Sequence, residues 1–532
     1  MTKFIIVTGG VLSGLGKGIL TASIGNLISS GKKCATIKCD GYLNIDPGKM
    51  NPGEHGEVFV LDDGTECDMD FGHYERFVGV TAKGNWSFTM GKVFQSIFEK
   101  EKENKFFGKT IQFVPHVTDE IKERINNIVK EENAEIVFIE IGGTVGDLEN
   151  ALYLEAMRQL SWEQGKENVL FVHLSYVPIP VGVNEQKSKP TQMSVKLLNE
   201  IGIQPDIIVC RCCEYLTSST KKKISLFCNL PEENVLTGID VDSVYLLPGE
   251  LRKQNLDKII EDKLKIKFEC NDCLVWDNLA KKMNNSKKEI NIGICGDHTD
   301  LSDSYASIIE TLKHCSANLN IGLNIKLISA KKIEDGENID FVLDGIDGII
   351  IPNGFDNQGW EGKVNIAKYA RENNIPFLGI CLGLQAAIIE YARNVCGLDA
   401  NSTQINSNIK DKIVTLLNAQ KEIVKKDGVL RLGAYKTNLK KNSVVFELYS
   451  ACEISERHRH EYEVNPNYYD ILEKNGLVIS GLSSDKKLVD FIELPKEKHC
   501  YFVATQSLPE LKSKLEKPSP LFFGLLKAII KK

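Results

Sequence analysis

The sequence predicts an α/β protein built from two doubly wound domains, and three observations carry this prediction. Short apolar runs alternate with amphipathic stretches along the chain, which is typical of parallel sheets covered by helices. A polar stretch at 271–289 interrupts this alternation and has the composition of a linker. With 532 residues, the chain is also too long for a single core. We therefore expect one domain over 1–270 and a second over 290–532.

The individual elements follow from these apolar runs. In the first half, buried parallel strands are expected at 3–8, 136–140, 169–176 and 206–210, and a helix at 19–29. In the second half, strands are expected at 290–295, 325–329, 346–351 and 375–380. Helix-like patterns lie between the runs, so both halves fit the alternation of strands and helices in a doubly wound sheet.

Composition and charge exclude several classes of function. Hydrophobic residues make up 42% of the chain and charged residues 26%, as in ordinary globular proteins. A net charge of −7, without a basic stripe, argues against general nucleic-acid binding. No apolar run in the sequence reaches the ~20 residues that a membrane span needs, and the first residues lead into a predicted strand rather than a signal peptide. We expect a cytoplasmic protein without a membrane or nucleic-acid partner.

A glycine-rich loop, Gly-Gly-Val-Leu-Ser-Gly-Leu-Gly-Lys-Gly, occupies residues 9–18 between a predicted strand and a predicted helix. Glycines there allow backbone N–H groups to face phosphate oxygens, and the helix N-terminus adds a favourable dipole. The spacing differs from the standard P-loop, because five residues separate Gly10 from Gly16 and Lys17 is followed by Gly18 instead of Ser or Thr. A flexible strand-to-helix turn is the alternative interpretation.

A phosphate loop that lacks this Ser or Thr needs magnesium ligands from elsewhere in the chain. Asp70 lies in the segment Cys-Asp-Met-Asp-Phe-Gly-His-Tyr-Glu-Arg-Phe at 67–77, and Glu140 ends a predicted strand before the glycine-rich run at 141–147. A carboxylate at the carboxyl end of a strand beside a phosphate loop can hold Mg²⁺ directly. The alternative is that both are solvated surface acids, but the dense glycines around Glu140 argue against it.

Five motifs in chain order together resemble CTP synthase. They are Val-Thr-Gly-Gly-Val at 7–11, His-Gly-Glu-Val-Phe-Val at 55–60, Gly-His-Tyr-Glu-Arg-Phe at 72–77, Glu-Ile-Gly-Gly-Thr-Val-Gly-Asp at 140–147 and Lys-Ser-Lys-Pro-Thr-Gln at 187–192. The resemblance continues to the C-terminus, where Lys-Pro-Ser-Pro at 517–520 and Gly-Leu-Leu at 524–526 look like eukaryotic members of the family. The first half would then be a P-loop-like amidoligase domain.

The resemblance implies that ATP phosphorylates O4 of UTP, that ammonia displaces the phosphate, and that CTP, ADP and phosphate result. Such phosphoryl transfer relies on Mg²⁺ and positioned cations. By similarity, the catalytic residues of this domain are Lys17 and Lys38, and the Mg²⁺ ligands are Asp70 and Glu140. The implied ATP site comprises Ser13, Gly14, Leu15, Gly16, Lys17, Gly18, Asp70 and Asp240. The implied UTP and CTP site comprises Ser13, Glu149, Lys187, Lys189, Gln192 and Lys223.

The second half resembles a class I glutamine amidotransferase domain. Gly-Ile-Cys-Leu-Gly at 379–383 follows an apolar run, and a strand-to-helix turn there would place the thiol of Cys381 at a helix N-terminus. A buried structural cysteine is the alternative, although the glycines two residues to either side favour the nucleophile elbow. The family motif for the base is His-Pro-Glu. Here it reads Leu508-Pro509-Glu510, which keeps the carboxylate and lacks the imidazole.

Other positions of the implied glutamine site also depart from the family. Glu461 stands where the family has an arginine for the α-carboxylate of glutamine, so attraction becomes repulsion. Gln404 stands where the family has a glutamate for the α-amino group, and Asn353 interrupts the Pro-Gly-Gly-Phe loop of the oxyanion hole. The other residues of this remnant are Gly354, Leu382 and Gln385. Base, anion clamp and ammonium acceptor are all changed, which predicts a lost glutaminase.

The leading hypothesis is ATP-dependent CTP synthesis with free ammonia, in which the C-terminal domain is retained for structure. One alternative is a complete glutamine-hydrolysing enzyme with another base, such as His458 or His460. A second is a silent paralogue that regulates an active enzyme, against which the retained charged residues around Lys17 argue. The resemblance further implies a homotetramer with nucleotides bound between subunits, and it makes GTP a candidate effector.

Overall fold

The chain forms two compact units. The computed structural model describes residues 1–50, 56–268, 273–283, 288–297, 299, 302–354, 358–416 and 431–532. The first unit contains residues 1–47 and 70–280, and the second contains residues 48–69 and 281–532. None of the helices in these described ranges is long and apolar enough to cross a membrane.

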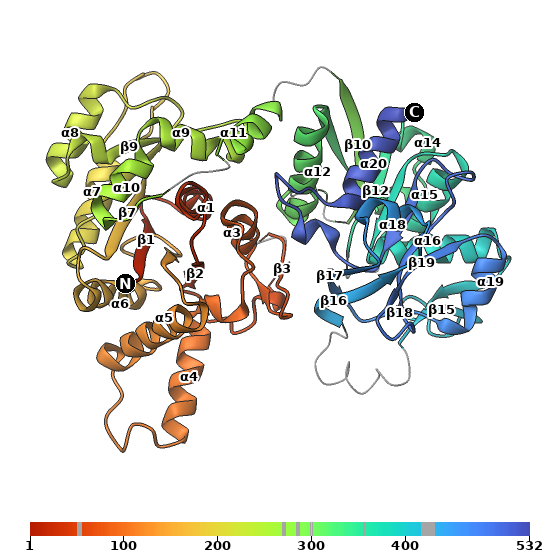
Figure 1. Cartoon of the computed structure of the whole chain (residues 1–532), viewed down its shortest axis with the longest axis horizontal. Helices are drawn as coiled ribbons and strands as arrows, with labels where there is room; N and C mark the ends of the chain where they lie inside the picture. The colour runs from red at the N-terminus through yellow and green to blue at the C-terminus, as the bar shows by residue number, and fades with distance from the viewer. Residues whose placement is uncertain are drawn as a thin grey trace. The chain divides into compact units, whose positions relative to one another are not determined.

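A seven-stranded parallel sheet lies at the centre of the first unit, in the order β5-β2-β6-β1-β7-β8-β9 (Figure 1). Its strands are β1 (Lys3–Gly9), β2 (Cys34–Asp40), β5 (Ser87–Thr89), β6 (Ile136–Ile141), β7 (Val169–Tyr176), β8 (Ile207–Cys212) and β9 (Val235–Ile239). Its helices are α1 (Lys17–Ile28), α3 (Asp70–Val78), α4 (Met90–Lys102), α5 (Thr118–Glu132), α6 (Ala151–Gln164), α7 (Lys189–Glu200), α8 (Ser218–Cys228), α9 (Leu247–Lys253), α10 (Leu256–Leu264) and α11 (Cys273–Lys282).

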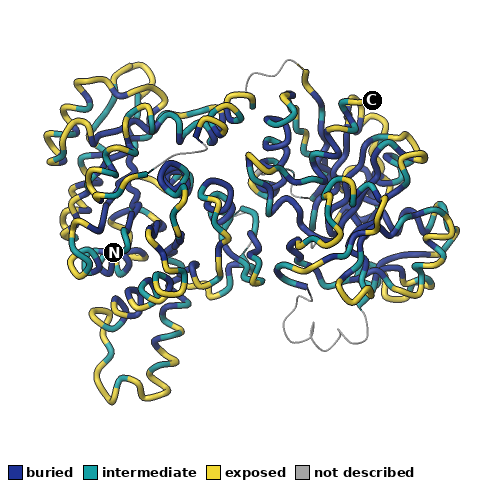
Figure 2. The backbone as a smooth tube through the Cα atoms, in the orientation of Figure 1, coloured by how far each residue is buried: buried dark blue, intermediate teal, exposed yellow. Residues whose placement is uncertain are grey.

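Helices cover both faces of this sheet because its strands are apolar on both sides. Strand β8 illustrates the pattern: Ile207 and Val209 pack in the core shared with α1, α9 and α10. Ile208 and Cys210 point the other way, into the core shared with α7 and α8. Figure 2 shows buried residues in the interior of each unit. The predicted doubly wound architecture is therefore confirmed for this half.

A nine-stranded sheet lies at the centre of the second unit, in the order β11-β10-β12-β13-β21-β20-β19-β16-β17. Its parallel part comprises β10 (Glu289–Gly296), β11 (Gly322–Ser329), β12 (Gly348–Ile351), β13 (Phe377–Ile380) and β21 (Phe502–Thr505). Its antiparallel part comprises β20 (Val489–Glu493), β19 (Val478–Ser483), β16 (Arg431–Leu439) and β17 (Glu453–His460). A smaller sheet contains β14 (Ala400–Ser402), β15 (Asp411–Thr415) and β18 (Glu463–Val464).

Helices cover both faces of this sheet. They are α12 (Ala306–Leu319), α13 (Ala330–Glu334), α14 (Ile339–Val342), α15 (Trp360–Glu372), α16 (Leu382–Asn394), α18 (Val444–Tyr449), α19 (Tyr469–Lys474) and α20 (Pro520–Lys531). Adjacent residues of β12 show the two faces: Ile349 packs in the core with α15 and α16, and Gly348 abuts Ile529 of α20. A Cβ at residue 348 would lie 2.5 Å from that isoleucine, so the close approach of α20 requires a glycine.

Helix α11 occupies most of the segment 271–289, for which the composition predicts a linker. The indole of Trp276 is buried, packs in a tilted orientation against the rings of Phe77 and Tyr245, and donates a hydrogen bond of 2.9 Å to the Tyr245 carbonyl. This aromatic contact holds a short helix that its polar neighbours do not predict. Residues 284–287 lie outside the described residues.

The segment 48–69 belongs to the second unit although it lies early in the chain. It contains the hairpin strands β3 (Phe59–Val60) and β4 (Glu66–Cys67). Two arginines of β17 hold it: Arg457 Nε lies 2.6 Å from Asp62 Oδ1, and Arg459 forms an ion pair with Glu66. The arrangement differs from the predicted domain boundaries, because ion pairs between residues almost 400 positions apart leave no local sequence pattern.

Candidate functional site

The glycine-rich loop lies at the carboxyl end of β1, the central strand of the first sheet. Gly14 and Gly16 have φ angles of 70° and 99°, which favour glycine over other residues. Lys17 begins α1, and a Cβ on Gly9 would lie 2.6 Å from its Cδ. Burial lowers the pKa of the Lys17 ammonium. The loop residue Ser13 is exposed. The backbone of the loop, the Ser13 hydroxyl and the Lys17 ammonium thus lie together at the carboxyl end of the strands.

Three carboxylates surround the ammonium of Lys38 on the neighbouring strand β2. The Nζ atom lies 2.5 Å from Asp70 Oδ2, 3.3 Å from Glu140 Oε1 and 3.6 Å from Asp40 Oδ1. The parallel register pairs Lys38 directly with Glu140 of β6, and Asp70 reaches the same point from the first turn of α3. The Tyr74 hydroxyl donates a hydrogen bond to the other oxygen of Glu140. The structure thus brings together the predicted residues Lys38, Asp70 and Glu140.

The two predicted metal ligands differ in their electrostatics. Burial alone would raise the pKa of Asp70, but Lys38, with His73 and Lys17, lowers it to about 2. For Glu140, burial dominates and raises the pKa. Asp70 also explains the unusual Gly18, because its carboxylate occupies the space that a Cβ on that glycine would need. A Ser or Thr at this position of the loop would collide with the acid.

These carboxylates fit a divalent cation that is shared with phosphate oxygens. Mg²⁺ in nucleotide sites commonly takes one or two protein carboxylates and completes its shell with phosphates and water. Asp70 and Glu140 already converge on one cation, the ammonium of Lys38. Across the described ranges, no group of three or more His, Cys, Asp or Glu side chains could hold a metal ion without help from phosphate oxygens.

An apolar cavity lies beside the loop and contains further residues of the predicted ATP site. Leu15 and Gly16 line it together with Asp240, which follows β9. Arg211 of β8 joins the two parts, because its Nε lies 2.8 Å from Asp240 Oδ1 and its Nη1 donates a hydrogen bond of 3.1 Å to the Leu15 carbonyl. The sequence did not single out Arg211. Its place at the carboxyl end of a predicted strand was the available signal.

The predicted UTP residues lie on the surface around α7. Lys187 and Lys189 flank the start of this helix, and Gln192 in its first turn donates a hydrogen bond to Ser188 Oγ. Lys223 lies on the adjacent helix α8, and together with Lys187 it lowers the pKa of Glu185. Glu149 lies apart from this group, where its backbone packs against Gly41. The four α7–α8 residues form a polar surface suited to an anionic ligand.

In the second unit, Cys381 lies in a sharp turn between β13 and α16. Its φ of 52° and ψ of −99° are unusual for a residue with a side chain. The turn requires glycines on both sides, because a Cβ on Gly379 would lie 2.7 Å from the Gly383 carbonyl oxygen, and one on Gly383 would clash with the Ile351 carbonyl. The Cys381 N–H donates a hydrogen bond of 2.6 Å to the Thr505 carbonyl of β21. This geometry matches the predicted nucleophile elbow.

Comparisons with known proteins assign both units. The family model of the CTP synthase N-terminus matches residues 3–266, and that of class-I glutamine amidotransferases matches residues 300–528. A CTP synthase of Borreliella afzelii is 51% identical over 536 residues, covering 99% of each chain, and one of Methanococcus maripaludis is 48% identical over the full length of both. The chain belongs to the CTP synthase family. The solved glutaminase domain of Trypanosoma brucei CTPS with bound acivicin is 34% identical over 46% of the chain and 94% of its own length, with a TM-score of 0.42.

Where CTP synthases carry the histidine base, a buried leucine stands in this chain. Leu508 is 4% exposed and precedes a short turn of helix at 509–512. Its N–H donates a hydrogen bond of 2.7 Å to the Arg457 carbonyl, so the backbone of the motif is anchored although the imidazole is missing. Glu510 is buried, and its carbonyl accepts a hydrogen bond of 3.1 Å from Thr311. The elbow and the carboxylate are therefore in place without the group that would connect them.

The surroundings of Cys381 favour the thiol over the thiolate. Burial raises its pKa to about 12, and the carboxylates of Glu510 and Glu463 act in the same direction. The Sγ atom lies 3.7 Å from the Arg459 carbonyl, to which the thiol donates. In the described part of the unit, no hydrogen bond joins Cys381 to a histidine.

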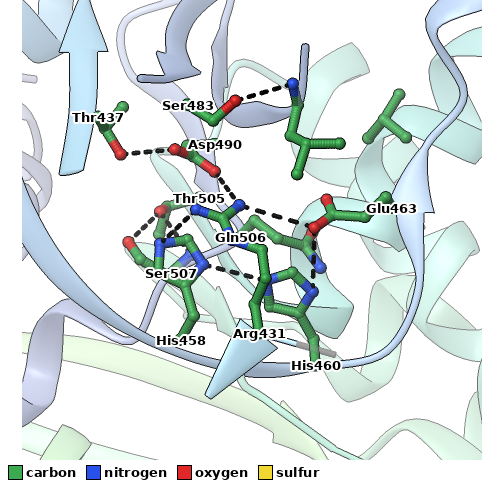
Figure 3. Close-up of polar contacts among 12 residues, drawn as sticks. Arg431, Thr437, His458, His460, Glu463, Ser483, Asp490, Thr505, Gln506 and Ser507 are labelled. Carbon is green, nitrogen blue, oxygen red and sulfur yellow. Dashed lines mark hydrogen bonds and ion pairs between the residues drawn. The ribbon is translucent and has the colours of Figure 1, made fainter. Parts of the chain in front are cut away.

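His458 and His460 are engaged in a different network (Figure 3). His458 Nδ1 lies 3.0 Å from His460 Nε2, and the guanidinium of Arg431 lies 3.5 Å from His458 Nε2. Arg431 is itself paired with Asp490 at 2.6 Å, and His460 faces Glu463 at 3.8 Å. Burial, reinforced by Arg431, holds the pKa of both imidazoles well below the usual range. Both ring nitrogens of His458 are thus directed at partners other than the thiol.

The remaining glutamine-site positions divide into two groups. Gly354 and Leu382 lie together, since a Cβ on the glycine would be 3.2 Å from Leu382 Cδ2, and Gln385 is buried on the same helix, α16. Gln404 follows β14, and Glu461 follows β17, where burial raises the pKa of its carboxyl. No hydrogen bond or ion pair from these two side chains to the elbow is found in the described ranges.

We predict that alkylation will show the raised pKa of Cys381 directly. Because only the thiolate reacts, the rate of iodoacetamide modification at Cys381 should keep rising up to about pH 11 without a plateau near neutrality. Exposed Cys452 provides an internal control in the same sample, and peptide mass spectrometry follows both sites. Modification of Cys381 at pH 7 that outpaces Cys452 would contradict the absence of an activating base.

Proposed function

We propose that this CTP synthase uses ammonia, and not glutamine, as its nitrogen donor. The observation that carries the proposal is the buried side chain of Leu508 at the predicted base position, together with a Cys381 thiol whose pKa burial raises to about 12. In a serine protease, removal of the histidine base lowers turnover roughly a millionfold. Glu461 and Gln404 support the same conclusion, because Glu461 would repel the α-carboxylate of glutamine and the neutral Gln404 offers no negative charge to its α-ammonium group.

The first unit would supply the phosphoryl-transfer chemistry. ATP would bind with its phosphates on the glycine-rich loop and its base in the cavity lined by Leu15 and Asp240. Asp70 and Glu140 would hold Mg²⁺, which neutralises charge on the transferring group, while Lys17 and Lys38 supply further positive charge. Binding of Mg²⁺·ATP would displace Lys38 from its two carboxylates, so its ammonium becomes available to the phosphates.

The reaction would then proceed in two steps. The O4 oxygen of UTP attacks the γ-phosphorus of ATP, ADP leaves, and a 4-phosphorylated intermediate forms. Ammonia then attacks C4, the C4–O bond breaks with release of phosphate, and the loss of protons from nitrogen yields CTP. The lysines Lys187, Lys189 and Lys223 would bind the UTP phosphates.

We predict that the unmodified chain will form CTP from UTP and ATP with ammonium chloride, whereas glutamine will give no CTP above the ammonia background. Cys381→Ala should leave the ammonia-driven rate within about twofold. Leu508→His alone should restore little glutamine-dependent activity, because Glu461 and Gln404 still oppose glutamine binding. Robust glutamine-dependent synthesis that disappears in Cys381→Ala would mean that another residue serves as the base.

We predict that charge removal in the first unit will abolish ammonia-driven synthesis without unfolding the chain. Lys17→Ala, and the double change Asp70→Asn with Glu140→Gln, should each lower kcat by about a hundredfold or more, the effect of removing one preorganised charge-stabilising group. Lys32→Ala is a matched control, because its ammonium pairs with Glu135 on the surface. Near-normal rates in the first two variants, with unchanged thermal unfolding, would place the chemistry elsewhere.

We also propose that the chain assembles as a homotetramer in which nucleotides bind between subunits. A ligand that bridges an interface stabilises the assembly by mass action. Sedimentation velocity should therefore show a shift toward the tetramer on addition of ATP and UTP. A monomer that persists at saturating concentrations of both nucleotides would overturn this expectation.

A further inference from the structure

We propose that His173 is a positioning residue that couples the ATP loop to the helix that carries the UTP lysines. The inference rests on the proposed function, because it concerns how the two nucleotide sites of that reaction communicate. It arises from a buried chain of three side chains, Thr8, His173 and Ser194, that connects β1, β7 and α7. The family resemblance assigned no role to any of them.

The imidazole of His173 bridges β1 and α7. Its Nδ1 lies 2.9 Å from the hydroxyl of Thr8, which is the penultimate residue of β1 before the glycine-rich loop. Its Nε2 lies 2.7 Å from the hydroxyl of Ser194 on α7. All three side chains are buried. A neutral imidazole has one donor and one acceptor nitrogen, and hydroxyls can complement either, so both contacts are satisfied at once.

The bridge also touches the loop itself. A Cβ on Gly10 would overlap the Ser194 hydroxyl and lie 3.1 Å from His173 Nε2, so this part of the loop lies directly against the His173–Ser194 contact. The Gly10 N–H donates a hydrogen bond of 3.0 Å to the carbonyl of Leu174, the residue after the histidine. Gly10, the second glycine of the loop, therefore packs directly against β7 and α7, so a shift of either element reaches it.

The same helix presents the predicted UTP residues. Lys189 and Gln192 lie in the first turn of α7, and Ser194 lies in the turn that follows. Because α7 is a rigid element in which Ser194 faces the sheet, a shift of its first turn on UTP binding reaches the Ser194 hydroxyl, and through His173 it reaches Thr8 and Gly10. Coupling through a hydrogen-bonded element of this kind is reciprocal, so ATP binding would bias the helix equally.

The imidazole of His173 forms the bridge between Thr8 and Ser194 as an uncharged group. Burial, with a smaller contribution from Lys17, lowers the pKa of His173 to about 3. The bridge therefore places no positive charge behind the loop that would compete with Lys17 for phosphate, and it keeps the same hydrogen-bonding capacity throughout the physiological pH range.

A second hydroxyl contact between β7 and α7 provides a matched control. Ser175 Oγ donates a hydrogen bond of 3.0 Å to Thr191 Oγ1, which links the same strand to the same helix without touching the loop. Both Ser175 and Ser194 are buried. Ser175→Ala and Ser194→Ala thus delete the same group from the same interface, and only Ser194→Ala breaks the path to Gly10.

The test is equilibrium binding of an ATP analogue that cannot transfer its phosphoryl group, measured by calorimetry on the full-length chain with Mg²⁺, with and without saturating UTP. In the unsubstituted chain and in Ser175→Ala, UTP should tighten analogue binding by the same factor. In Ser194→Ala this factor should fall by about two- to tenfold, the range expected for one buried neutral hydrogen bond. His173→Asn, which can keep the Thr8 contact but is too short to reach Ser194, should show the same loss, and the two changes together should not add.

The outcomes separate this inference from the proposed function. If the unsubstituted chain binds the analogue and UTP but Ser194→Ala and Ser175→Ala lose coupling equally, or neither loses any, then His173 has only a structural role and the inference is overturned. If UTP has no effect on analogue binding in the unsubstituted chain, it is likewise overturned while ammonia-driven CTP synthesis stands. Failure to bind either nucleotide would refute the proposed function itself.

Discussion

The ammonium of Lys38 allows two carboxylates to lie side by side in the interior of the first unit. Asp70 and Glu140 would repel each other in a buried site, and each would lose hydration. With the ammonium 2.5 Å from one and 3.3 Å from the other, the acids are held at the carboxyl end of the parallel strands, facing the phosphate loop. The loop, the glycine at residue 18 and the first turn of α3 are all arranged around this cluster.

In the second unit, by contrast, the groups around the predicted nucleophile do not stabilise its charged form. The elbow has the glycines that permit the sharp turn, but burial and the carboxylates of Glu510 and Glu463 raise the pKa of Cys381, whose thiol donates to the Arg459 carbonyl. The nearby histidines His458 and His460 are occupied with Arg431 and Glu463. The sheet and helices of this unit are held by apolar packing and the buried Arg431–Asp490 pair.

The features that the sequence could predict are those with local signals. The glycine spacing around Cys381 predicts the elbow, and the apolar runs predict the strands on which Lys38 and Glu140 meet. Features that depend on distant partners could not be predicted. Arg211 acquires a role only when β8 brings it beside the loop, and the segment 48–69 joins the second unit through ion pairs with β17. The role of His173 could not be predicted either, because this residue lies within a buried apolar strand and belongs to no motif.

The most direct test of the account is to trace the nitrogen atom itself. The chain would be supplied with UTP, Mg²⁺·ATP, glutamine carrying an isotopically labelled amide nitrogen, and unlabelled ammonium chloride, and the CTP formed would be weighed by mass spectrometry. If ammonia is the nitrogen donor as proposed, the CTP will be unlabelled at every glutamine concentration, because Leu508 at the predicted base position cannot accept the proton of Cys381. Transfer of the label into CTP, at a level that ammonia released spontaneously from glutamine does not explain, would contradict it.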